Sequence, residues 1–280
     1  MSQVRIGVAQ FAPALGQLEA NLALCVRALE DAGAAGCELV VLPECATSGF
    51  MFESKEHAWT CADEIPGRAT EAFAAVAAEH HLHCVVGMLE RNGDQLHNAA
   101  VLIGPEGLVG TYRKTHLPRG GVDRFVTPGD ELKVFDTPLG RIGIQICYDL
   151  RFPEVTRVLA IKGAQIVAHP TNWPVLALPT AAFVTRARAY DNRVVLATAN
   201  RYGVDGWGEF CGHSQIVSLD GERLAHAGGD EDALLFADVE LPRASDRVIV
   251  TRPDEYELRL FEDRRPDLYD GLVAESHPSP

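Results

Sequence analysis

A cysteine stands where an apolar, strand-like segment gives way to polar residues. Residues 142–146 read Ile-Gly-Ile-Gln-Ile, an alternation rich in β-branched side chains that favours an extended strand, and Cys147 follows directly. Pro153 then suits the first turn of a helix. A thiol between a strand end and a helix start has backbone N–H groups nearby, which favour a thiolate and a developing oxyanion. Cys147 is therefore a candidate nucleophile.

Two other residues could serve this thiol. Glu44 follows the apolar run 40–43, at the strand end where open α/β sheets place their sites, and is a candidate general base. Lys114 follows a second strand-like segment and could stabilise an anionic tetrahedral intermediate. Taken singly, Glu44 could be a turn residue and Lys114 a solvated surface residue. His116 is interpreted as structural.

These three segments together resemble the nitrilase superfamily of carbon–nitrogen hydrolases, in which Glu, Lys and Cys occur in this order. The matching motifs are Leu-Pro-Glu at 42–44, Tyr-Arg-Lys-Thr-His-Leu at 112–117 and Cys-Tyr-Asp-Leu-Arg-Phe-Pro-Glu at 147–154. Weaker matches at 170–173, 186–188 and 212–214 extend the resemblance over nearly the whole chain. The resemblance implies a four-layer α-β-β-α sandwich.

The resemblance also implies a covalent mechanism that needs no metal and no organic cofactor. Glu44 takes the thiol proton of Cys147, and the sulfur attacks the amide carbonyl. Lys114 and the backbone N–H of Tyr148 stabilise the oxyanion. Glu44 then protonates the leaving amine and activates water against the thioester, because one carboxylate can act as base and acid in successive steps.

The loop after Lys114 departs from the family pattern. Many members carry a second glutamate there, but residues 119–129 contain none. Asp123 is the carboxylate of this loop before Pro128 and is our candidate for a second acid. A pairing of Asp123 with Arg124, or a role in capping a turn, is the alternative.

The residues after the nucleophile bear on the substrate. Family members that hydrolyse nitriles typically show Cys-Trp-Glu, whereas this chain shows Cys-Tyr-Asp, as amidases do. We therefore expect an amidase first, an N-carbamoyl amine or amino acid amidohydrolase second, and a nitrilase third. Tyr148 and Trp173 are expected to line the substrate pocket, with a core role for Trp173 as the alternative. A substrate carboxylate would need a basic partner, for which the candidates are Arg119, Arg124 and Arg151.

Two further classes stay open from the residues alone. The chain could be a non-catalytic relative that binds a ligand or serves assembly, although all three residues of the catalytic set are present. It could also be a thiol hydrolase that pairs Cys147 with His116 or His169.

Apolar runs and amphipathic segments alternate along the 280 residues, which indicates an α/β or α+β fold with mixed sheets. Nothing marks a linker, so we expect one domain over 1–280. The net charge of −14 at pH 7 argues against nucleic acid or an anionic membrane as a partner. The seven cysteines form no metal-binding or disulfide spacing, and no signal peptide is recognisable, so we expect a cytoplasmic protein.

The last segment, from about 251 to 280, is charged and contains proline. Relatives commonly form dimers with such tails at the interface, and we therefore expect a homodimer or a larger homo-oligomer. A tail that docks on its own subunit would have the same sequence pattern.

Overall fold

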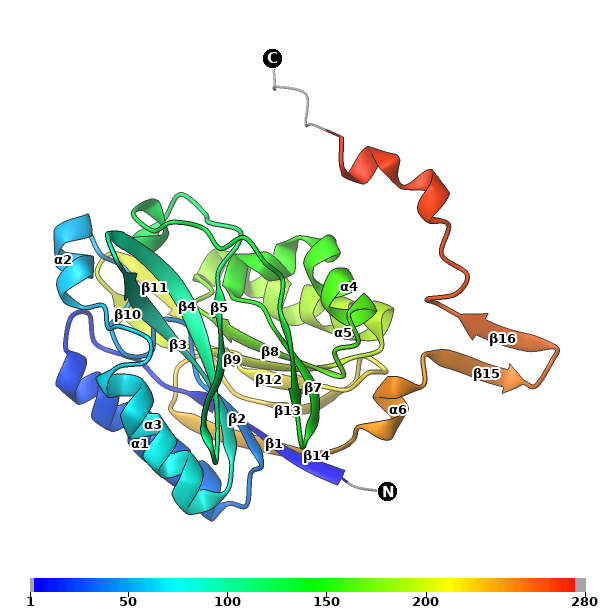
Figure 1. The fold of residues 1–280 in the computed structure, drawn as a ribbon, viewed down its shortest axis with the longest axis horizontal. Coiled ribbons are helices and arrows are strands. Elements are labelled where there is room, and N and C mark those ends of the chain that lie inside the picture. Colours follow the sequence, from blue (N-terminus) through cyan, green and yellow to red (C-terminus); the bar gives the residue numbers. More distant parts are fainter. Residues whose placement is uncertain (1–2, 275–280) are drawn as a thin grey trace.

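Two six-stranded sheets form the centre of the molecule. A computed structural model describes residues 3–274 (Figure 1). The first sheet has the order β14 (Ala233–Glu240), β1 (Gln3–Gln10), β2 (Leu39–Val41), β3 (His83–Asn92), β4 (Gln95–Gly104) and β5 (Gly107–Arg113). The second has the order β13 (Arg223–His226), β12 (Gln215–Val217), β9 (Val195–Asn200), β8 (Ile166–Thr171), β7 (Gly140–Ile144) and β6 (Val134–Thr137).

Each sheet is mixed, with a parallel centre. Strands β1, β2 and β3 run parallel, as do β7, β8 and β9, whereas the outer strands pair antiparallel. The carboxyl ends of parallel strands lie at one edge of a sheet, which is where such folds build sites. Glu44, Cys147 and Asn172 all follow central parallel strands.

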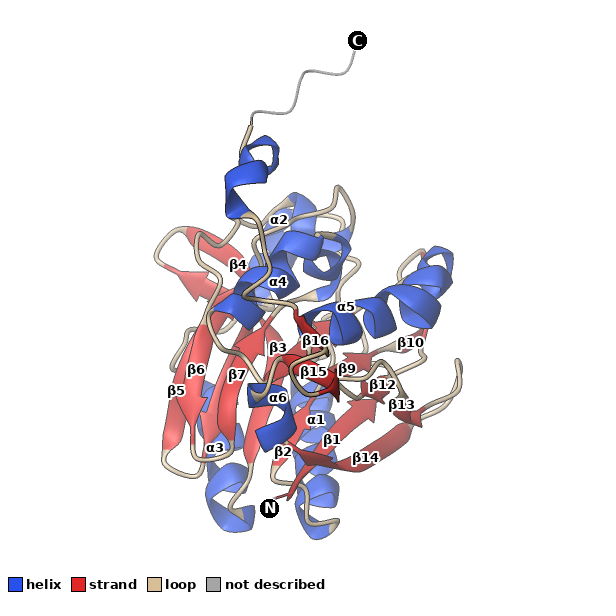
Figure 2. Cartoon of the chain, turned by 90° about the vertical axis from the view of Figure 1, so that its right-hand side faces the viewer, coloured by secondary structure: helices blue, strands red, loops and turns tan. Residues whose placement is uncertain are grey.

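Helices cover the outer face of each sheet. Figure 1 shows α1 (Leu18–Ala34) and α3 (Arg68–His80) on one side, and α4 (Pro153–Ile161) and α5 (Thr185–Asn192) on the other. Figure 2 shows the strands as the middle layers between these helices. The expected four-layer α-β-β-α sandwich is confirmed, with two short helices, α2 (Lys55–Thr60) and α6 (Pro242–Ser245), outside the layers.

Alternation along the strands explains the layering. In β2, Leu39 and Val41 pack into the core between the sheets, whereas Val40 packs into the core beneath α1 and α3. A central strand buried on both faces is apolar at successive positions. This is why residues 39–42 are a continuous apolar run.

Several elements differ from the sequence-based expectation. The amphipathic segment 180–190, whose pattern predicts one helix, begins as a π-helical turn, Thr180–Val184, before α5. Two hairpins were not anticipated: β10 (Tyr202–Asp205) with β11 (Gly208–Cys211), and β15 (Val248–Arg252) with β16 (Tyr256–Arg259). Short 3-10 turns add Gly121–Arg124, Cys147–Arg151, Val175–Ala177, Pro266–Leu268 and Asp270–Leu272.

The chain after α6 leaves the body of the molecule as an extended arm (Figure 1). The arm contains the β15–β16 hairpin, and its Phe261 ring packs against the guanidinium groups of Arg157 and Arg247. Residues 275–280 of the expected C-terminal extension lie outside the described residues. Within residues 3–274, no helix has the length and apolar character needed to cross a membrane.

Candidate active site

Glu44 lies in a tight turn that crosses β3 at Gly87. Gly87 N donates to Pro43 O (3.2 Å), and Ala46 N donates to Gly87 O (2.8 Å). A Cβ at position 87 would lie 2.5 Å from Glu44 Cα, so any side chain there would displace the Glu44 backbone. The glycine is therefore needed for this close approach. On the far side, Asn172 Nδ2 donates to Glu44 O (2.9 Å) and fixes the same turn to the second sheet.

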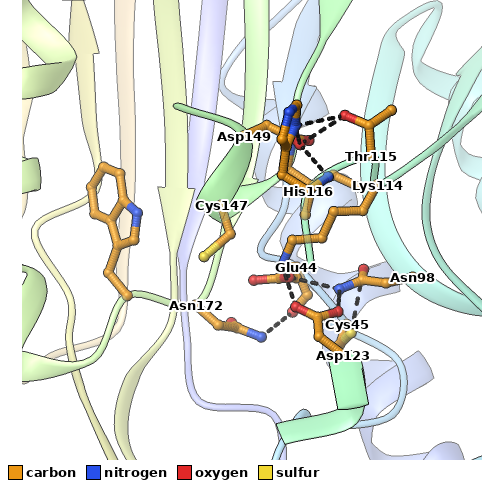
Figure 3. Close-up of polar contacts among 12 residues, drawn as sticks. Glu44, Cys45, Asn98, Lys114, Thr115, His116, Asp123, Cys147, Asp149 and Asn172 are labelled. Atoms are coloured by element: carbon orange, nitrogen blue, oxygen red, sulfur yellow. Dashed lines mark hydrogen bonds and ion pairs between the residues drawn. The ribbon is translucent and has the colours of Figure 1, made fainter. Parts of the chain in front are cut away.

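Four buried side chains form one hydrogen-bonded network (Figure 3). Lys114 Nζ contacts Glu44 Oε1 at 2.7 Å and Asp123 Oδ2 at 2.5 Å. Asn98 Nδ2 donates to Glu44 Oε1 (2.7 Å) and to Asp123 Oδ1 (2.8 Å). Burial by itself lowers the pKa of Lys114, but the two carboxylates raise it well above its ordinary value. The lysine is therefore a fixed cation.

The two oxygens of Glu44 are not equivalent. Oε1 accepts from both Lys114 and Asn98, whereas Oε2 is buried with no hydrogen-bond partner among the described residues. Figure 3 shows the Cys147 side chain extending toward this carboxylate. A buried carboxylate oxygen with a free lone pair can accept a proton from a thiol, or bind the N–H of a ligand.

Cys147 occupies a strained backbone position after β7. It begins the 3-10 turn Cys147–Arg151 and has a φ of 46°, a conformation that non-glycine residues seldom adopt. Burial, and to a smaller extent the Glu44 charge, raise the pKa of its thiol to about 12, against the opposing effect of Lys114. The thiol therefore stays protonated at neutral pH and needs a base when it reacts. The Thr171 hydroxyl and the Asn172 N–H favour the thiolate and lower the pKa of Cys147 in part.

Asp149 holds this turn in place. Its Oδ2 accepts from Ile146 N (2.9 Å) and Tyr112 Oη (2.7 Å), and its Oδ1 accepts from His116 N (3.0 Å). Asp149 is fully buried, and although burial raises its pKa, these donors lower it below the usual range. A carboxylate with this many donors is a structural anchor.

Neither candidate histidine serves the thiol. His116 Nδ1 lies 2.9 Å from Asp149 Oδ1, and its ring stacks on Phe152. His169 Nε2 lies 3.3 Å from the carbonyl oxygen of Cys147, and burial lowers the pKa of His169 to about 4, which keeps it neutral. The geometry gives no support to a Cys–His pair, and the interpretation of His116 as structural fits its contacts.

A cavity of about 430 Å³ opens above Cys147. Its lining is mostly apolar and includes Phe50, Met51, Tyr148, Trp173, Trp207 and Phe210. Arg151 is the charged side chain among the described lining residues, and its Nη1 contacts Thr180 Oγ1 at a long 3.4 Å. Within residues 3–274, no group of three or more His, Cys, Asp or Glu side chains could hold a metal ion.

A model of the family described as carbon-nitrogen hydrolase matches residues 5–247. The chain belongs to this family. It is 35% identical over 268 residues to a nitrilase of Pyrococcus abyssi, covering 95% of this chain and 99% of that protein. It is 32% identical over 257 residues to the omega-amidase NIT2 of Homo sapiens, covering 86% and 88%. A carbon–nitrogen hydrolase of Helicobacter pylori G27 has the same fold, with a TM-score of 0.86, 26% identity and coverage of 98% and 99%.

The structure of this carbon–nitrogen hydrolase brings together the residues that the sequence singled out. Glu44, Lys114 and Cys147 lie at one site, and Tyr148 and Trp173 line the cavity above them. Trp173 is also 3% exposed, so it lies in the core as well as in the cavity lining. Asp123 reaches Lys114 despite its short side chain.

The three arginines considered as partners for a substrate carboxylate differ in their position relative to the cavity. Arg124 does not pair with Asp123, because its guanidinium donates to the carbonyl oxygens of Gly121 (3.1 Å) and Phe52 (2.8 Å). Arg119 is absent from the described lining of the cavity, whereas Arg151 is part of it. Two residues that sequence reasoning missed are Asn98, which bridges the two carboxylates, and Asn172, which holds the Glu44 turn.

Proposed function

We propose that this carbon–nitrogen hydrolase is an amidase that converts a small carboxamide to a carboxylic acid and ammonia through a thioester on Cys147. The observation that carries the proposal is that the two carboxylate oxygens of Glu44 differ in their hydrogen-bond partners. Oε1 is held by Lys114 at 2.7 Å, and Oε2 is buried without a partner on the side of the thiol. The carboxylate is thus fixed in place and still able to take a proton.

In acylation, Cys147 Sγ attacks the carbonyl carbon, the thiol proton passes to Glu44, and a C–S bond forms. The negative charge on the carbonyl oxygen is stabilised by Lys114 Nζ and by the N–H of Tyr148, which lies in the first turn after the nucleophile and has no helical acceptor there. The C–N bond then breaks, and Glu44 returns its proton to the departing nitrogen as ammonia forms.

In deacylation, Glu44 takes a proton from water, and the hydroxide oxygen attacks the thioester carbon. The C–S bond breaks, Cys147 regains a proton from Glu44, and the carboxylic acid leaves. Asp123 is assigned a supporting role: its Oδ2 also holds Lys114 Nζ, at 2.5 Å. This contact keeps the ammonium group oriented between the two carboxylates.

An amide is favoured over a nitrile by the Cys-Tyr-Asp motif at 147–149 and by the omega-amidase relative. The nitrilase relative makes nitrile hydrolysis the competing activity. Arg151 at the cavity also allows a substrate with a distal carboxylate, as in the half-amides of dicarboxylic acids. An N-carbamoyl amine remains the second choice.

The experiment that tests this proposal is an ammonia-release screen with four substrate classes: aliphatic amides, half-amides of dicarboxylic acids, N-carbamoyl amines and nitriles. We expect the highest kcat/KM on one of the two amide classes, and none for Cys147→Ala. A matched control is Cys37→Ala, the same change at a buried cysteine before β2, away from the site. A highest kcat/KM on nitriles or carbamoyl compounds would contradict the amidase assignment.

We further propose that two copies associate through the C-terminal arm. The arm extends from the body, and Tyr256, Leu268 and Leu272 expose apolar side chains along it. Burying them against a second copy would remove this apolar surface from water. Light scattering should give twice the 30.4 kDa chain mass, and Leu268→Ser with Leu272→Ser should shift it toward one chain. A wild-type mass of one chain would contradict the proposal.

A further inference from the structure

The β10–β11 hairpin places a tryptophan at the mouth of the active-site cavity. Its two-residue turn is Gly206-Trp207, with Asp205 paired to Gly208. Gly206 has a φ of 56°, which suits the first position of such a turn. Trp207 lines the cavity and yet is 72% exposed. A large apolar side chain in this position is available to a bound ligand.

The turn end of the hairpin is fixed on one wall of the cavity. Asp205 Oδ2 accepts from Phe50 N (2.8 Å) and Met51 N (3.1 Å), and it pairs with the buried Arg201 at 2.7 Å. The turn itself packs on Met51, because a Cβ at Gly206 or at Gly208 would lie 3.1 Å from Met51 side-chain atoms. The hairpin is therefore held by buried, charge-assisted hydrogen bonds rather than free to swing.

The other strand of the hairpin is fixed to a second segment of the cavity wall. Cys211 N donates to Trp173 O (3.0 Å), and Phe210 forms a bridge with Pro174. The Phe210 ring also packs edge-on against Phe50, with 6.3 Å between ring centroids. The position of Trp207 is thus set by two segments of the cavity wall.

The cavity changes character with distance from the nucleophile. At its base lie the charged groups that act on an amide, whereas its walls and rim are mostly apolar, with Arg151 as the charged side chain among them. Leu176 at the rim is 93% exposed, which matches the exposure of Trp207. An apolar group that covers such surfaces gains roughly 25 cal/mol for each Å² removed from water.

We propose that Trp207 is a specificity-determining residue, and that the preferred substrates are primary amides whose acyl group is an apolar chain or ring long enough to contact it. The inference rests on the proposed amidase function and specifies its substrate class. Hexanamide and phenylacetamide represent that class, and acetamide is too short to extend from Cys147 to the rim. Trp207 contributes binding at the distal end and takes no part in bond making.

The test measures kcat/KM for hexanamide and for acetamide, and compares their ratio among variants. We expect the ratio to favour hexanamide in the wild type and to fall about tenfold in Trp207→Ala, which is the size of effect that one apolar contact supplies. Trp207→Phe should keep most of the ratio. The matched control is Val204→Ala, since Val204 is 70% exposed on the same hairpin and is not among the cavity-lining residues.

The outcomes separate the two proposals. If the protein hydrolyses amides but the ratio is unchanged in Trp207→Ala, or falls equally in Val204→Ala, then the inference about Trp207 is wrong and the amidase assignment stands. If the wild type releases ammonia from neither amide nor from any other carboxamide, the amidase assignment is wrong and the inference falls with it. A rise in KM for hexanamide with little change in kcat would place the contribution of Trp207 in binding.

Discussion

Glu44 and Lys114 form a buried ion pair of 2.7 Å that occupies one oxygen of the carboxylate and leaves the other without a partner. Two charges removed from water are tolerated because the network that includes Asn98 and Asp123 supplies further hydrogen bonds. The same arrangement points the free oxygen at the side of the site where the thiol lies. Stability and chemistry therefore depend on the same four side chains.

Replacing Glu44 by Gln should preserve the shape of the site and remove the base. The amide oxygen can still accept from Lys114, but the variant cannot take the thiol proton. Burial is the largest cause that raises the pKa of Cys147, and it persists in the variant, so the thiol has neither a base nor a solvated environment to help it ionise at neutral pH. We expect kcat/KM to fall by about 10²–10⁴. The alkylation rate of Cys147 by iodoacetamide, followed by peptide mass, should fall as well; a wild-type rate would remove Glu44 as the base.

Asp123 should give the enzyme an acidic limb in its pH profile. Burial raises the pKa of Asp123 to about 6, an effect that Glu44 reinforces and Lys114 opposes. As the pH falls through about 6, the carboxylate gains a proton and weakens its hold on Lys114, so kcat/KM should fall. Asp123→Asn should show lower activity at neutral pH and lose this step. An unchanged profile in the variant would assign the limb to another group.

The effect of Asp123 on stability has the opposite sign. Because the folded state binds the proton more tightly than an unfolded carboxyl does, the contribution is present below the ordinary pKa of 3.8 and is lost as the pH rises through about 6. Urea unfolding at several pH values should show this loss in the wild type. It should be absent in Asp123→Asn.

Gly87 should tolerate no side chain. A Cβ there would meet Glu44 Cα and Pro43 O at 2.5 Å each, and both are backbone atoms that cannot rotate away. Gly87→Ala should lower the free energy of unfolding by about 1–3 kcal/mol and reduce activity by moving Glu44. Gly271→Ala, where a Cβ meets nothing within 4 Å and the backbone has no positive φ, controls for the substitution itself. Equal effects at the two positions would contradict the close-approach argument.

Asn98 should contribute both to the stability of the fold and to activity. Its Nδ2 donates to Glu44 and to Asp123, so Asn98→Ala leaves two buried acceptors short of a donor. We expect a loss of about 1–3 kcal/mol in the free energy of unfolding, measured by urea titration, together with a lower kcat. Asn98→Asp should be worse, because a third carboxylate would face the other two. A variant with wild-type kcat would show that Asn98 does not orient the base.

The layers and the three principal site residues could be predicted from the sequence because each is marked by a pattern of neighbouring residues. Continuous apolar runs mark strands buried on two faces, and Glu44 follows such a run. Cys147 follows the alternating run 142–146, and Lys114 follows the half-exposed outer strand β5. The order of these residues along the chain then matched a family pattern. The fold and the identity of the site were therefore accessible without coordinates.

The residues that orient the catalytic set could not be predicted from the sequence in the same way. Asn98 lies on β4 and meets Glu44 across 54 positions of sequence, a pairing that no local pattern encodes. The positive φ of Cys147 also leaves no composition signal, since such positions usually carry glycine. The β10–β11 hairpin did leave one, because Gly206 stands at the first position of the two-residue turn Gly206-Trp207, where hairpin turns favour glycine.

The central claim is that the acyl group passes through Cys147, and hydroxylamine trapping tests it most directly. Hydroxylamine attacks a thioester to give a hydroxamate and the free thiol, in competition with water. We predict that the wild type, turning over an amide, forms hydroxamate in increasing proportion as hydroxylamine is raised, and that Cys147→Ala forms neither hydroxamate nor ammonia. Ammonia release that persists in Cys147→Ala, or a wild type that releases ammonia with no hydroxamate at any hydroxylamine concentration, would contradict the account.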